Sequence, residues 1–504
     1  MNNSEFKKVG YSIKQLRQER GLTQADFAKE LNTSQSAVAR MEAGKQNFTT
    51  EELLKIGKVL NRKILSLSES LDFQIKGGQK LAGAITTNFS KNGSVALLCA
   101  SLLNKDKTIL HGISRIEEVY RMIEVLQSLG VAVRWLNQNT VEIVPPANFS
   151  FDKIDREAAS KIRSSLMLIG SLIHHAKEFA LPHAGGCKMG QRTIAAHRYG
   201  LENMGIKIST KDQYYFISAK QLKATEVILY EASDTAAINN ILAAALIPNE
   251  TIIRFAPPNY QVQEVCFFLE KMGVKISGTG TTNLSIQGIK EFAQPLEYHN
   301  SEDPIESMMF IACAATTGSK LTIKRCPIDF LSLELLKLEK MGLKFSLSKK
   351  YKSYNGLTNL IDITVFPSKL KAPADKIHAL PYPGINSDNL PFFVPIATQA
   401  KGTTLIHDWM WENRAIYFTE LNRLGAQLNL ADPHRVFVNG PTPLKAAQIV
   451  CPPALRPAMI ILIAMIAAEG TSILRNIYSI NRGYEEIAAR LNSIGANIRV
   501  LREM

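Results

Sequence analysis

The chain has 504 residues, of which 46% are hydrophobic and 21% charged, and its formal net charge is +14. This length predicts two to four domains, and the composition is ordinary for a soluble globular protein. No uninterrupted apolar run reaches membrane length and the N-terminus has no apolar signal core, so we expect a cytoplasmic protein without membrane spans. The apolar run at 459–468 is expected to be a buried helix.

The positive charge is consistent with anionic small-molecule substrates and, more weakly, with nucleic acid. A generally basic protein without such a partner is the alternative. The six cysteines have no CxxC or zinc-ligand spacing, so no metal site is expected. Five of them stand in apolar contexts and are expected to be reduced and buried. Cys187 is the exception.

Residues 8–66 are predicted to form a separate helix-turn-helix module. An amphipathic segment ends at Gly21, and Thr23 then stands where a helix cap is expected. A tight turn leads to a second helix capped by Ser34, and a further helix is expected to begin with Thr50 as its cap. Two short helices joined by a tight turn are typical of DNA-binding proteins. Residues 67–74 are interpreted as a polar linker.

The residues at 22–24, 27–28, 31, 34–35, 38, 41–42 and 44 resemble the phage-repressor-like (XRE-type) family of these modules. The resemblance implies that Gln35, Ser36 and Arg40 face base edges in the major groove, with Gln24 at the DNA backbone. Such modules work as dimers on paired half-sites, so a DNA target implies a homodimer. The alternative is a helical module for dimerisation or protein contact.

The rest of the chain repeats one short pattern six times. Each copy is an amphipathic run, a glycine, and then alternating residues, which predicts a helix, its C-terminal cap and a strand. The glycines are Gly130, Gly205, Gly273, Gly342, Gly425 and Gly495. They lie 68 to 83 residues apart, which is the length of a whole α/β unit rather than of a solenoid repeat. The pattern therefore predicts an α/β protein built by internal duplication.

Two local features suggest chemistry. Lys91 follows Ser90 at a predicted strand-to-helix junction, where the positive end of a helix dipole suits an anion. Cys187 follows Gly185-Gly186 and precedes Lys188 and Arg192. Nearby cations lower the pKa of a thiol, and a cysteine after two glycines is an unusual core residue, so a reactive thiol is predicted.

Across residues 73–504 the chain resembles the UDP-N-acetylglucosamine 1-carboxyvinyltransferase (enolpyruvyl transferase) family, which makes peptidoglycan precursors. The resemblance rests on several motifs. They are Gly77-Gly78, Ser90-Lys91-Asn92, Ile162-Arg163-Ser164-Ser165, Gly185-Gly186-Cys187-Lys188-Met189-Gly190-Gln191-Arg192, Pro383-Gly384-Ile385-Asn386-Ser387-Asp388, Glu412-Asn413-Arg414, Ala454-Leu455-Arg456 and Ile480-Asn481-Arg482-Gly483-Tyr484-Glu485.

The resemblance implies an inside-out α/β barrel of two domains with three units each. One domain would comprise 75–90 and 297–504, the other 91–296, with the active site between them. It also implies transfer of enolpyruvyl from phosphoenolpyruvate to a sugar 3′-hydroxyl with release of phosphate, and no cofactor.

The resemblance further implies roles for individual residues. Cys187 would be the acid and the target of the antibiotic fosfomycin, and Asp388 the base. Asn92 would contact the sugar. The cations that would hold the anionic substrates are Lys91, Arg163, Arg192, Arg414, Arg456 and Arg482.

The chain departs from the family mainly on the nucleotide side. The family's uracil-contacting Asp is Ala195 here, its diphosphate segment is replaced at 233–239, and a late Asp is Ala454. Asp234 would be unfavourable near a diphosphate unless paired or turned away. The acceptor could therefore be UDP-N-acetylglucosamine or another molecule. A transcription regulator with an enzyme-like sensor body is a further alternative, as is the shikimate-pathway relative, which lacks the Cys187 loop.

Overall fold

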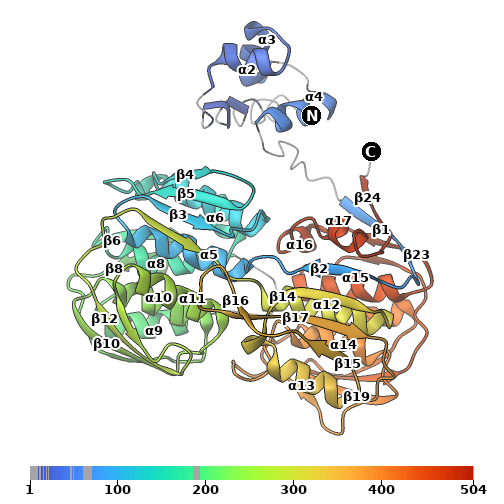
Figure 1. Ribbon diagram of the computed structural model, residues 1–504. Helices are drawn as coiled ribbons and strands as arrows, with labels where there is room; N and C mark the ends of the chain where they lie inside the picture. The colour runs from blue at the N-terminus through green and yellow to red at the C-terminus, as the bar shows by residue number, and fades with distance from the viewer. Residues whose placement is uncertain are drawn as a thin grey trace. The chain divides into compact units, whose positions relative to one another are not determined.

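The computed structural model describes residues 10, 13–14, 16–18, 20, 22–45, 48, 50–60, 71–185 and 193–502 (Figure 1). The chain divides into two compact units, an N-terminal unit up to Ser70 and a body from Leu71 to Leu501. No helix in the described ranges is long and apolar enough to cross a membrane. The apolar run at 459–468 lies in a buried helix, as expected.

The N-terminal unit contains the predicted helix-turn-helix. Its helices are α2 (Gln24–Glu30), α3 (Gln35–Glu42) and α4 (Thr50–Val59). Thr23 and Asp26 form a reciprocal capping box, and the Ser34 hydroxyl accepts from the Ala37 amide, which confirms both expected caps. Helix α4 includes Thr50 itself, so the expected cap is instead the first helical residue. A small apolar core holds the helices together through Phe27, Val38, Leu53 and Ile56.

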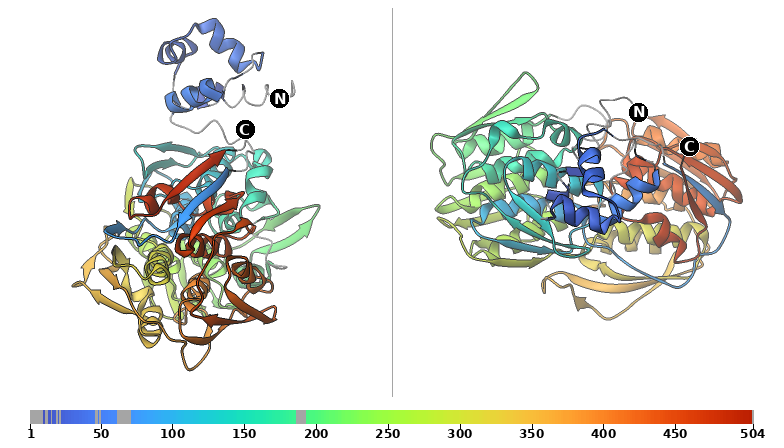
Figure 2. Two further views of the ribbon diagram at one scale, coloured as in Figure 1. Left: turned by 90° about the vertical axis from the view of Figure 1, so that its right-hand side faces the viewer. Right: turned by 90° about the horizontal axis from the view of Figure 1, so that it is seen from above.

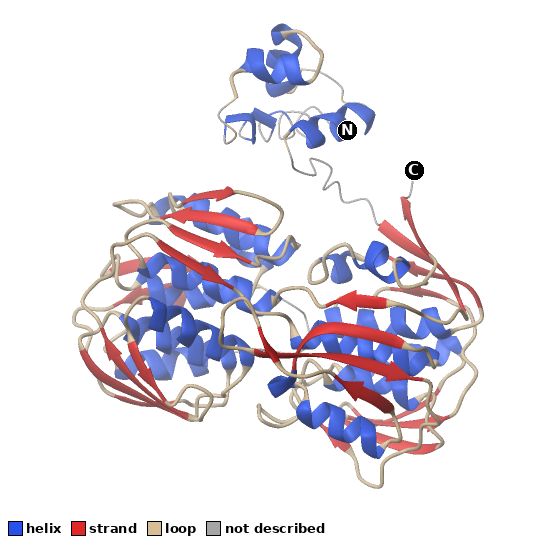
Figure 3. Ribbon diagram, in the orientation of Figure 1, coloured by secondary structure: helices blue, strands red, loops and turns tan. Residues whose placement is uncertain are grey.

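Within the described residues, the body has six small sheets arranged around buried helices (Figure 3). In the middle of the chain, the first sheet has the order β13-β3-β5-β4, the second β6-β8-β7 and the third β11-β12-β10-β9. Their strands are β3 (Thr108–His111), β4 (Ala132–Trp135), β5 (Thr140–Val144), β6 (Glu178–Pro182), β7 (Lys207–Lys211), β8 (Tyr214–Ser218), β9 (Glu226–Ile228), β10 (Asn249–Arg254), β11 (Lys275–Ser277), β12 (Asn283–Gly288) and β13 (Leu296–His299).

The other three sheets combine the start of the body with its C-terminal part. Their orders are β15-β17-β14-β2, β18-β19-β21-β20 and β22-β23-β1-β24, and β16 also pairs with β17. The strands are β1 (Leu71–Gly77), β2 (Ala84–Thr86), β14 (Leu321–Pro327), β15 (Lys344–Leu347), β16 (Tyr351–Lys352), β17 (Asn359–Phe366), β18 (Ile377–His378), β19 (Gly402–His407), β20 (Gln427–Asp432), β21 (Arg435–Gly440), β22 (Gln448–Val450), β23 (Gly470–Arg475) and β24 (Ile498–Arg502).

Each unit contributes one almost wholly buried helix and one helix that ends at a repeat glycine. The buried helices are α5 (Lys91–Ala100), α8 (Leu168–Leu172), α10 (Asp234–Ala245), α12 (Pro304–Thr317), α14 (Phe393–Ala397) and α15 (Leu455–Ala467). The second set is α6 (Glu117–Ser128), α9 (Ala195–Asn203), α11 (Tyr260–Lys271), α13 (Ser332–Lys340), the 3-10 helix η6 (Ala415–Leu424) and α17 (Ile487–Asn492). Of two further short helices, α7 (Arg156–Lys161) precedes α8, and α16 (Tyr478–Asn481) lies between α15 and α17 within the last unit.

All six repeat glycines adopt the left-handed backbone conformation, with φ between 83° and 102°. A residue with a Cβ atom is strained there, so glycine is the residue that lets each helix stop and the next strand begin. The strand that follows each glycine forms one end of its sheet. The sixfold repeat predicted from these glycines is confirmed.

The first strand of the body completes the last sheet of the chain. Strand β1 lies between β23 and β24 and runs antiparallel to β23, and it is visible in blue among red strands in Figure 2. Residues 71–74, expected to be linker, therefore belong to strand β1, and Phe73 and Gln74 pair with Leu474 and Ile473 of β23. The linker prediction is wrong for these four residues.

The body has two separate hydrophobic cores. One draws on residues of 95–298 and the other on 73–85 and 305–498, together with Tyr260. On this basis we propose the same division into a middle half, 91–296, and an outer half, 75–90 and 297–504, with the chain crossing between them along β13, which pairs in the first sheet of the middle half. The terms middle half and outer half are used in this sense below.

A buried carboxyl group joins the two halves. Glu264 of α11 accepts a hydrogen bond from the Tyr298 hydroxyl at 2.9 Å, and the Asn355 amide of the outer half lies 3.3 Å from the same carboxyl oxygen. Burial raises the pKa of Glu264 to about 7. The folded protein therefore holds a proton that the unfolded chain releases near pH 4.5, so this group's contribution to stability is complete below that pH and is lost as pH rises toward 7.

Glu264→Gln is expected to reduce the fall in melting temperature between pH 5 and pH 8, because the amide cannot release a proton. Melting curves of wild type and variant at both pH values measure this. Glu339→Gln changes an exposed carboxylate and should leave the wild-type fall intact. An equal fall in all three proteins would show that Glu264 is ionised in the folded state.

Candidate active site

A pocket lies between the two halves of the body. Its lining combines residues of both halves: Asn88, Phe89, Lys91, Ser114, Ile116, Asp303, Glu306, Arg456, Gly483, Tyr484 and Glu485. Two of the predicted substrate-binding cations, Lys91 and Arg456, are thus brought together although 365 positions separate them in the sequence. The lining also carries three carboxyl groups, those of Asp303, Glu306 and Glu485, so the pocket combines both signs of charge.

Lys91 is the first residue of α5, as its position after Ser90 predicted. The Ser90 hydroxyl caps the helix by accepting from the Gly93 amide, and the Lys91 amide donates to Asp303 Oδ2 at 3.1 Å. The Lys91 ammonium lies 2.8 Å from Glu118 Oε2, and both side chains are largely buried. Burial alone would raise the pKa of Glu118, but Lys91 and then Arg482 together lower it. The positive charge of Lys91 is therefore paired with the Glu118 carboxylate before any substrate binds.

Asp388 forms an ion pair with Arg456, the other cation of the pocket. Arg456 Nη2 donates to Asp388 Oδ2 at 2.9 Å, and the Asp388 amide donates to the Asn386 side chain at 2.9 Å. Burial opposes ionisation of Asp388, but the adjacent Arg456 charge outweighs it and lowers the pKa to about 2. The carboxylate is therefore ionised at neutral pH, the state a general base requires, but a weak proton acceptor while Arg456 stays in place.

Arg456 extends from the start of α15 and is buried. Besides Asp388, it donates to the Tyr484 hydroxyl at 2.8 Å. Asp303 caps α12 close by, and burial raises its pKa while Arg456 acts in the opposite direction. The sequence analysis missed Glu118 and Asp303 as site residues. Asp303-Pro304 did carry a signal, since Asp followed by Pro marks a helix start, whereas no local pattern singles out Glu118.

Arg414 was expected to bind substrate, but its guanidinium has other partners. It donates to both carboxylate oxygens of Asp408, at 2.5 and 2.8 Å, and to the Ser387 carbonyl at 2.7 Å. Its side chain is only 1% exposed, and its nearest approach to Asp388 is 4.0 Å. In this structure Arg414 therefore holds the 387–388 backbone in place rather than facing the pocket.

Three of the remaining predicted residues lie within the described ranges, and none of them lines the pocket. Asn92 donates to the Tyr260 hydroxyl at 2.8 Å, and the Arg482 charge acts on Glu118. Arg163 donates to the Thr193 carbonyl at 2.7 Å and does not line the pocket. Cys187 and Arg192 lie outside the described residues.

On the expected nucleotide side, Asp234 is paired. Its Oδ2 atom accepts from the Asn259 amide at 2.9 Å and from the Gln261 amide at 2.7 Å. Burial, and to a lesser extent Asp388, raise its pKa to about 7, against the effect of the two amides. The raised pKa favours the neutral form of Asp234, which reduces the expected conflict with an anionic acceptor.

The N-terminal unit presents the predicted DNA-contacting residues in two ways. Gln35, Ser36 and Arg40 are exposed on α3. Gln24 instead donates to Glu42 Oε2 at 2.9 Å, and Glu42 also pairs with Arg17. Contact between Gln24 and a DNA backbone remains a prediction and requires this side chain to exchange partners.

Comparison with protein families gives two matches. A model described as EPSP synthase (3-phosphoshikimate 1-carboxyvinyltransferase) matches residues 75–491, and a helix-turn-helix model matches residues 13–67. A protein of Treponema denticola called UDP-N-acetylglucosamine 1-carboxyvinyltransferase is 35% identical over 438 residues, which is 85% of this chain and 99% of the relative. A protein of the same name from Borrelia garinii is 32% identical over 84% of this chain and 98% of its own length.

Solved structures share the fold of the body. An enolpyruvyl transferase from Streptomyces tendae superposes with a TM-score of 0.74 at 21% identity, covering 86% of this chain and all of that one. EPSP synthase from Acinetobacter baumannii gives a TM-score of 0.66 at 18% identity with the same coverage of this chain. At these identities the likeness concerns the fold alone.

Proposed function

Because the chain belongs through its body to the enolpyruvyl transferase family, we propose that it transfers enolpyruvyl from phosphoenolpyruvate to the 3′-hydroxyl of UDP-N-acetylglucosamine. The acceptor oxygen bonds to C2 of phosphoenolpyruvate while C3 gains a proton. The adduct then loses a C3 proton, and its C2–O bond to phosphate breaks. Acceptor and phosphoenolpyruvate thus become the enolpyruvyl ether and inorganic phosphate, without an oxidant or reductant.

The observation that carries this proposal is the convergence of Lys91, Arg456 and Asp388 between the halves of the body. Phosphoenolpyruvate carries a phosphate and a carboxylate, so its site needs several cations. Lys91 and Arg456 supply two, with Arg482 beside Glu118. Arg163 and Arg192 are proposed as further contacts from the family resemblance. On binding, the substrate's negative charge competes with Glu118 and Asp388 for these cations.

This competition gives Asp388 its catalytic role. When a substrate oxyanion draws the charge of Arg456, the main interaction that lowers the pKa of Asp388 weakens. The Asp388 carboxylate then becomes a stronger base for the acceptor hydroxyl proton. Cys187 is proposed as the acid that protonates C3, on the strength of the family resemblance and its neighbours Lys188 and Arg192 in the sequence.

A different acceptor is the second candidate. The altered segments at 193–196 and 233–238 favour a different acceptor, and Asp234 lies in the second of them. Burial raises the pKa of Asp234 to about 7, and the carboxyl group accepts hydrogen bonds from two side-chain amides. Such a group also suits an acceptor molecule that offers a hydrogen-bond donor at this place instead of a diphosphate. A sensor body without turnover is the third candidate. The convergence of Lys91 and Arg456 in one pocket, with Asp388 bonded to Arg456, argues against it.

The test is phosphate release from phosphoenolpyruvate with and without UDP-N-acetylglucosamine, using wild type and Cys187→Ala. Release that requires the sugar nucleotide and falls strongly in the variant supports the proposal. If phosphoenolpyruvate binds but no phosphate is released, UDP-N-acetylglucosamine is not the acceptor, and other hydroxyl compounds are then the molecules to test. If none of these supports turnover, a sensor role becomes the better explanation.

Fosfomycin is expected to add once per chain, at Cys187. The other five cysteines are buried, and burial raises the pKa of each thiol, so they carry little thiolate at neutral pH. Intact mass spectrometry after incubation measures the number of adducts. The variant Cys187→Ala should show none, and an adduct that persists in it would contradict the assignment.

We propose that the N-terminal unit binds duplex DNA through α3, as a homodimer on paired half-sites. The exposed Gln35, Ser36 and Arg40 side chains support this. Arg40→Ala is expected to lower the affinity for fragments selected from a random duplex pool by about tenfold or more. Electrophoretic mobility shifts measure this, with Arg423→Ala in the body as the matched control. Equal binding by wild type and Arg40→Ala would favour a protein-contact role for the module.

A further inference from the structure

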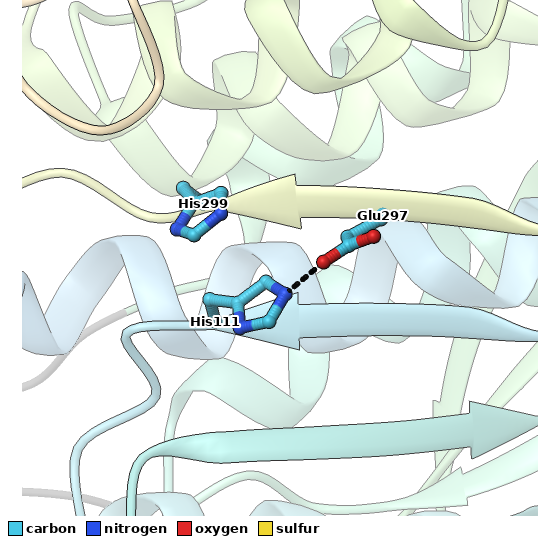
Figure 4. Close-up of side chains that lie close together, drawn as sticks. All are labelled: His111, Glu297 and His299. Atoms are coloured by element: carbon cyan, nitrogen blue, oxygen red, sulfur yellow. Dashed lines mark hydrogen bonds and ion pairs between the residues drawn. The ribbon is translucent and has the colours of Figure 1, made fainter.

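Two histidines and a glutamate meet on one face of the first sheet of the middle half. Strands β3 and β13 are parallel neighbours, and their register places His111 opposite His299 and Ile109 opposite Glu297. Since side chains alternate along a strand, Glu297 and His299 share a face. Leu110, Leu296 and Tyr298 point to the buried side, so the three polar side chains occupy the outer face (Figure 4).

The ligand atoms of these three side chains are close together. One nitrogen or carboxylate oxygen from each lies within 4.8 Å of the others, and this is the single such group of metal-ligand side chains within the described ranges. His111 Nε2 lies 2.6 Å from Glu297 Oε1. Two imidazoles and a carboxylate are a common zinc ligand set and leave a fourth position open. We propose that His111, Glu297 and His299 bind a divalent transition-metal ion, with zinc the expected occupant.

A hydroxyl group is in place to orient one ligand. His111 Nδ1 lies 3.0 Å from Thr140 Oγ1 on β5. A histidine that binds a metal through one ring nitrogen usually donates its other N–H to an oxygen, which fixes its tautomer. When His111 Nε2 binds a metal, the proton is on Nδ1, and the Thr140 hydroxyl accepts it in a hydrogen bond. When the proton is on Nε2 and points toward Glu297, the Thr140 hydroxyl donates to Nδ1 instead.

The charges around the site partly favour and partly oppose a cation. The Glu297 carboxylate supplies a negative charge to the ligand set, which favours a divalent cation. Lys271 is a nearby cation that acts on both Glu297 and His299 and disfavours metal binding. The two rings are stacked, with centroids 4.2 Å apart and planes 11° apart, so one must rotate before both nitrogens point at one ion.

A second histidine pair in the fold provides a matched comparison. In the sheet β18-β19-β21-β20, His378 lies opposite His407 on parallel neighbouring strands, as His299 does opposite His111. Two residues before His378 stands Lys376, whereas Glu297 stands two residues before His299. Burial lowers the pKa of the His407 imidazole, and the positive charge of Lys376 lowers it further. The same backbone arrangement thus carries a carboxylate ligand in one unit and a repelling ammonium in another.

Calorimetric titration of untagged, metal-free, full-length protein with zinc chloride tests the proposal. We expect wild type to bind one more zinc ion per chain than His299→Gln or Glu297→Lys, or to bind it at least about a hundredfold more tightly, since removing a ligand costs more than removing an outer-shell partner. His378→Gln should match wild type. Circular dichroism checks that the variants are folded.

Cobalt supplies a second readout. Co²⁺ is expected to give a visible absorption band in wild type and His378→Gln that is lost in Glu297→Lys. Zinc binding by wild type and His299→Gln with equal stoichiometry and affinity, or no zinc binding by wild type at all, would overturn the proposal. These measurements do not involve phosphoenolpyruvate, so they are independent of the proposed transferase activity.

Discussion

Asp388→Asn is expected to lower the rate of phosphate release by about a thousandfold, within the range typical of a lost general base. The asparagine side chain has nearly the same shape as that of aspartate, but it cannot take up the proton that leaves the hydroxyl group of the acceptor substrate. It also removes the charge that pairs with Arg456 at 2.9 Å, so phosphoenolpyruvate should bind at least as tightly as in wild type. The measurement is kcat and KM for phosphoenolpyruvate under saturating acceptor.

The matched control for this variant is Asp432→Asn, which changes a partly exposed aspartate on β20 that pairs with the exposed Arg435. Its kcat should equal that of wild type. A large rise in KM with unchanged kcat in Asp388→Asn would contradict the role of base and would indicate that Asp388 only orients Arg456.

Asp408→Asn is expected to destabilise the body by about 3–5 kcal/mol, the usual cost of leaving one member of a buried ion pair without its partner. Asp408 is 0% and Arg414 1% exposed, and the pair is bidentate. Water cannot compensate the Arg414 charge there. Urea unfolding followed by circular dichroism measures the shift in the transition midpoint.

The variant Asp432→Asn is again the control, because its ion pair with Arg435 is exposed to solvent, and no measurable shift is expected. Activity should also fall in Asp408→Asn, since Arg414 holds the Ser387 carbonyl next to Asp388. A midpoint equal to that of wild type would mean that Arg414 finds another anion, and its assignment as a residue that positions the 387–388 backbone would then fail.

The repeat and the small helical module were predictable because their signals are local. Gly130 and its five counterparts each sit at a left-handed position that the preceding helix and following strand require, and both elements are visible in neighbouring residues. Thr23 and Ser34 were predictable as caps for the same reason, since a cap acts within three or four positions of itself.

The charge partners of the site could not be predicted in this way. Lys91 and Arg456 were assigned to substrate through the family resemblance, but nothing near either residue in the sequence indicates Glu118 or Tyr484 as its partner. Arg414 stands in a motif that matches the family as well as Arg456 does. The two arginines differ in the partners that the folded chain brings to each: Asp408 and the Ser387 carbonyl for Arg414, and Asp388 and the Tyr484 hydroxyl for Arg456.

The sequence by itself determined the units, their order and the points where helices end, because these depend on backbone conformation and on apolar periodicity over a few residues. Only the tertiary structure decided which side chains meet. It brought β1 into the last sheet, paired Arg414 with Asp408 and placed His111 opposite His299, 188 positions later in the sequence. These contacts depend on sheet order and strand register, which arise from the packing of whole units against one another.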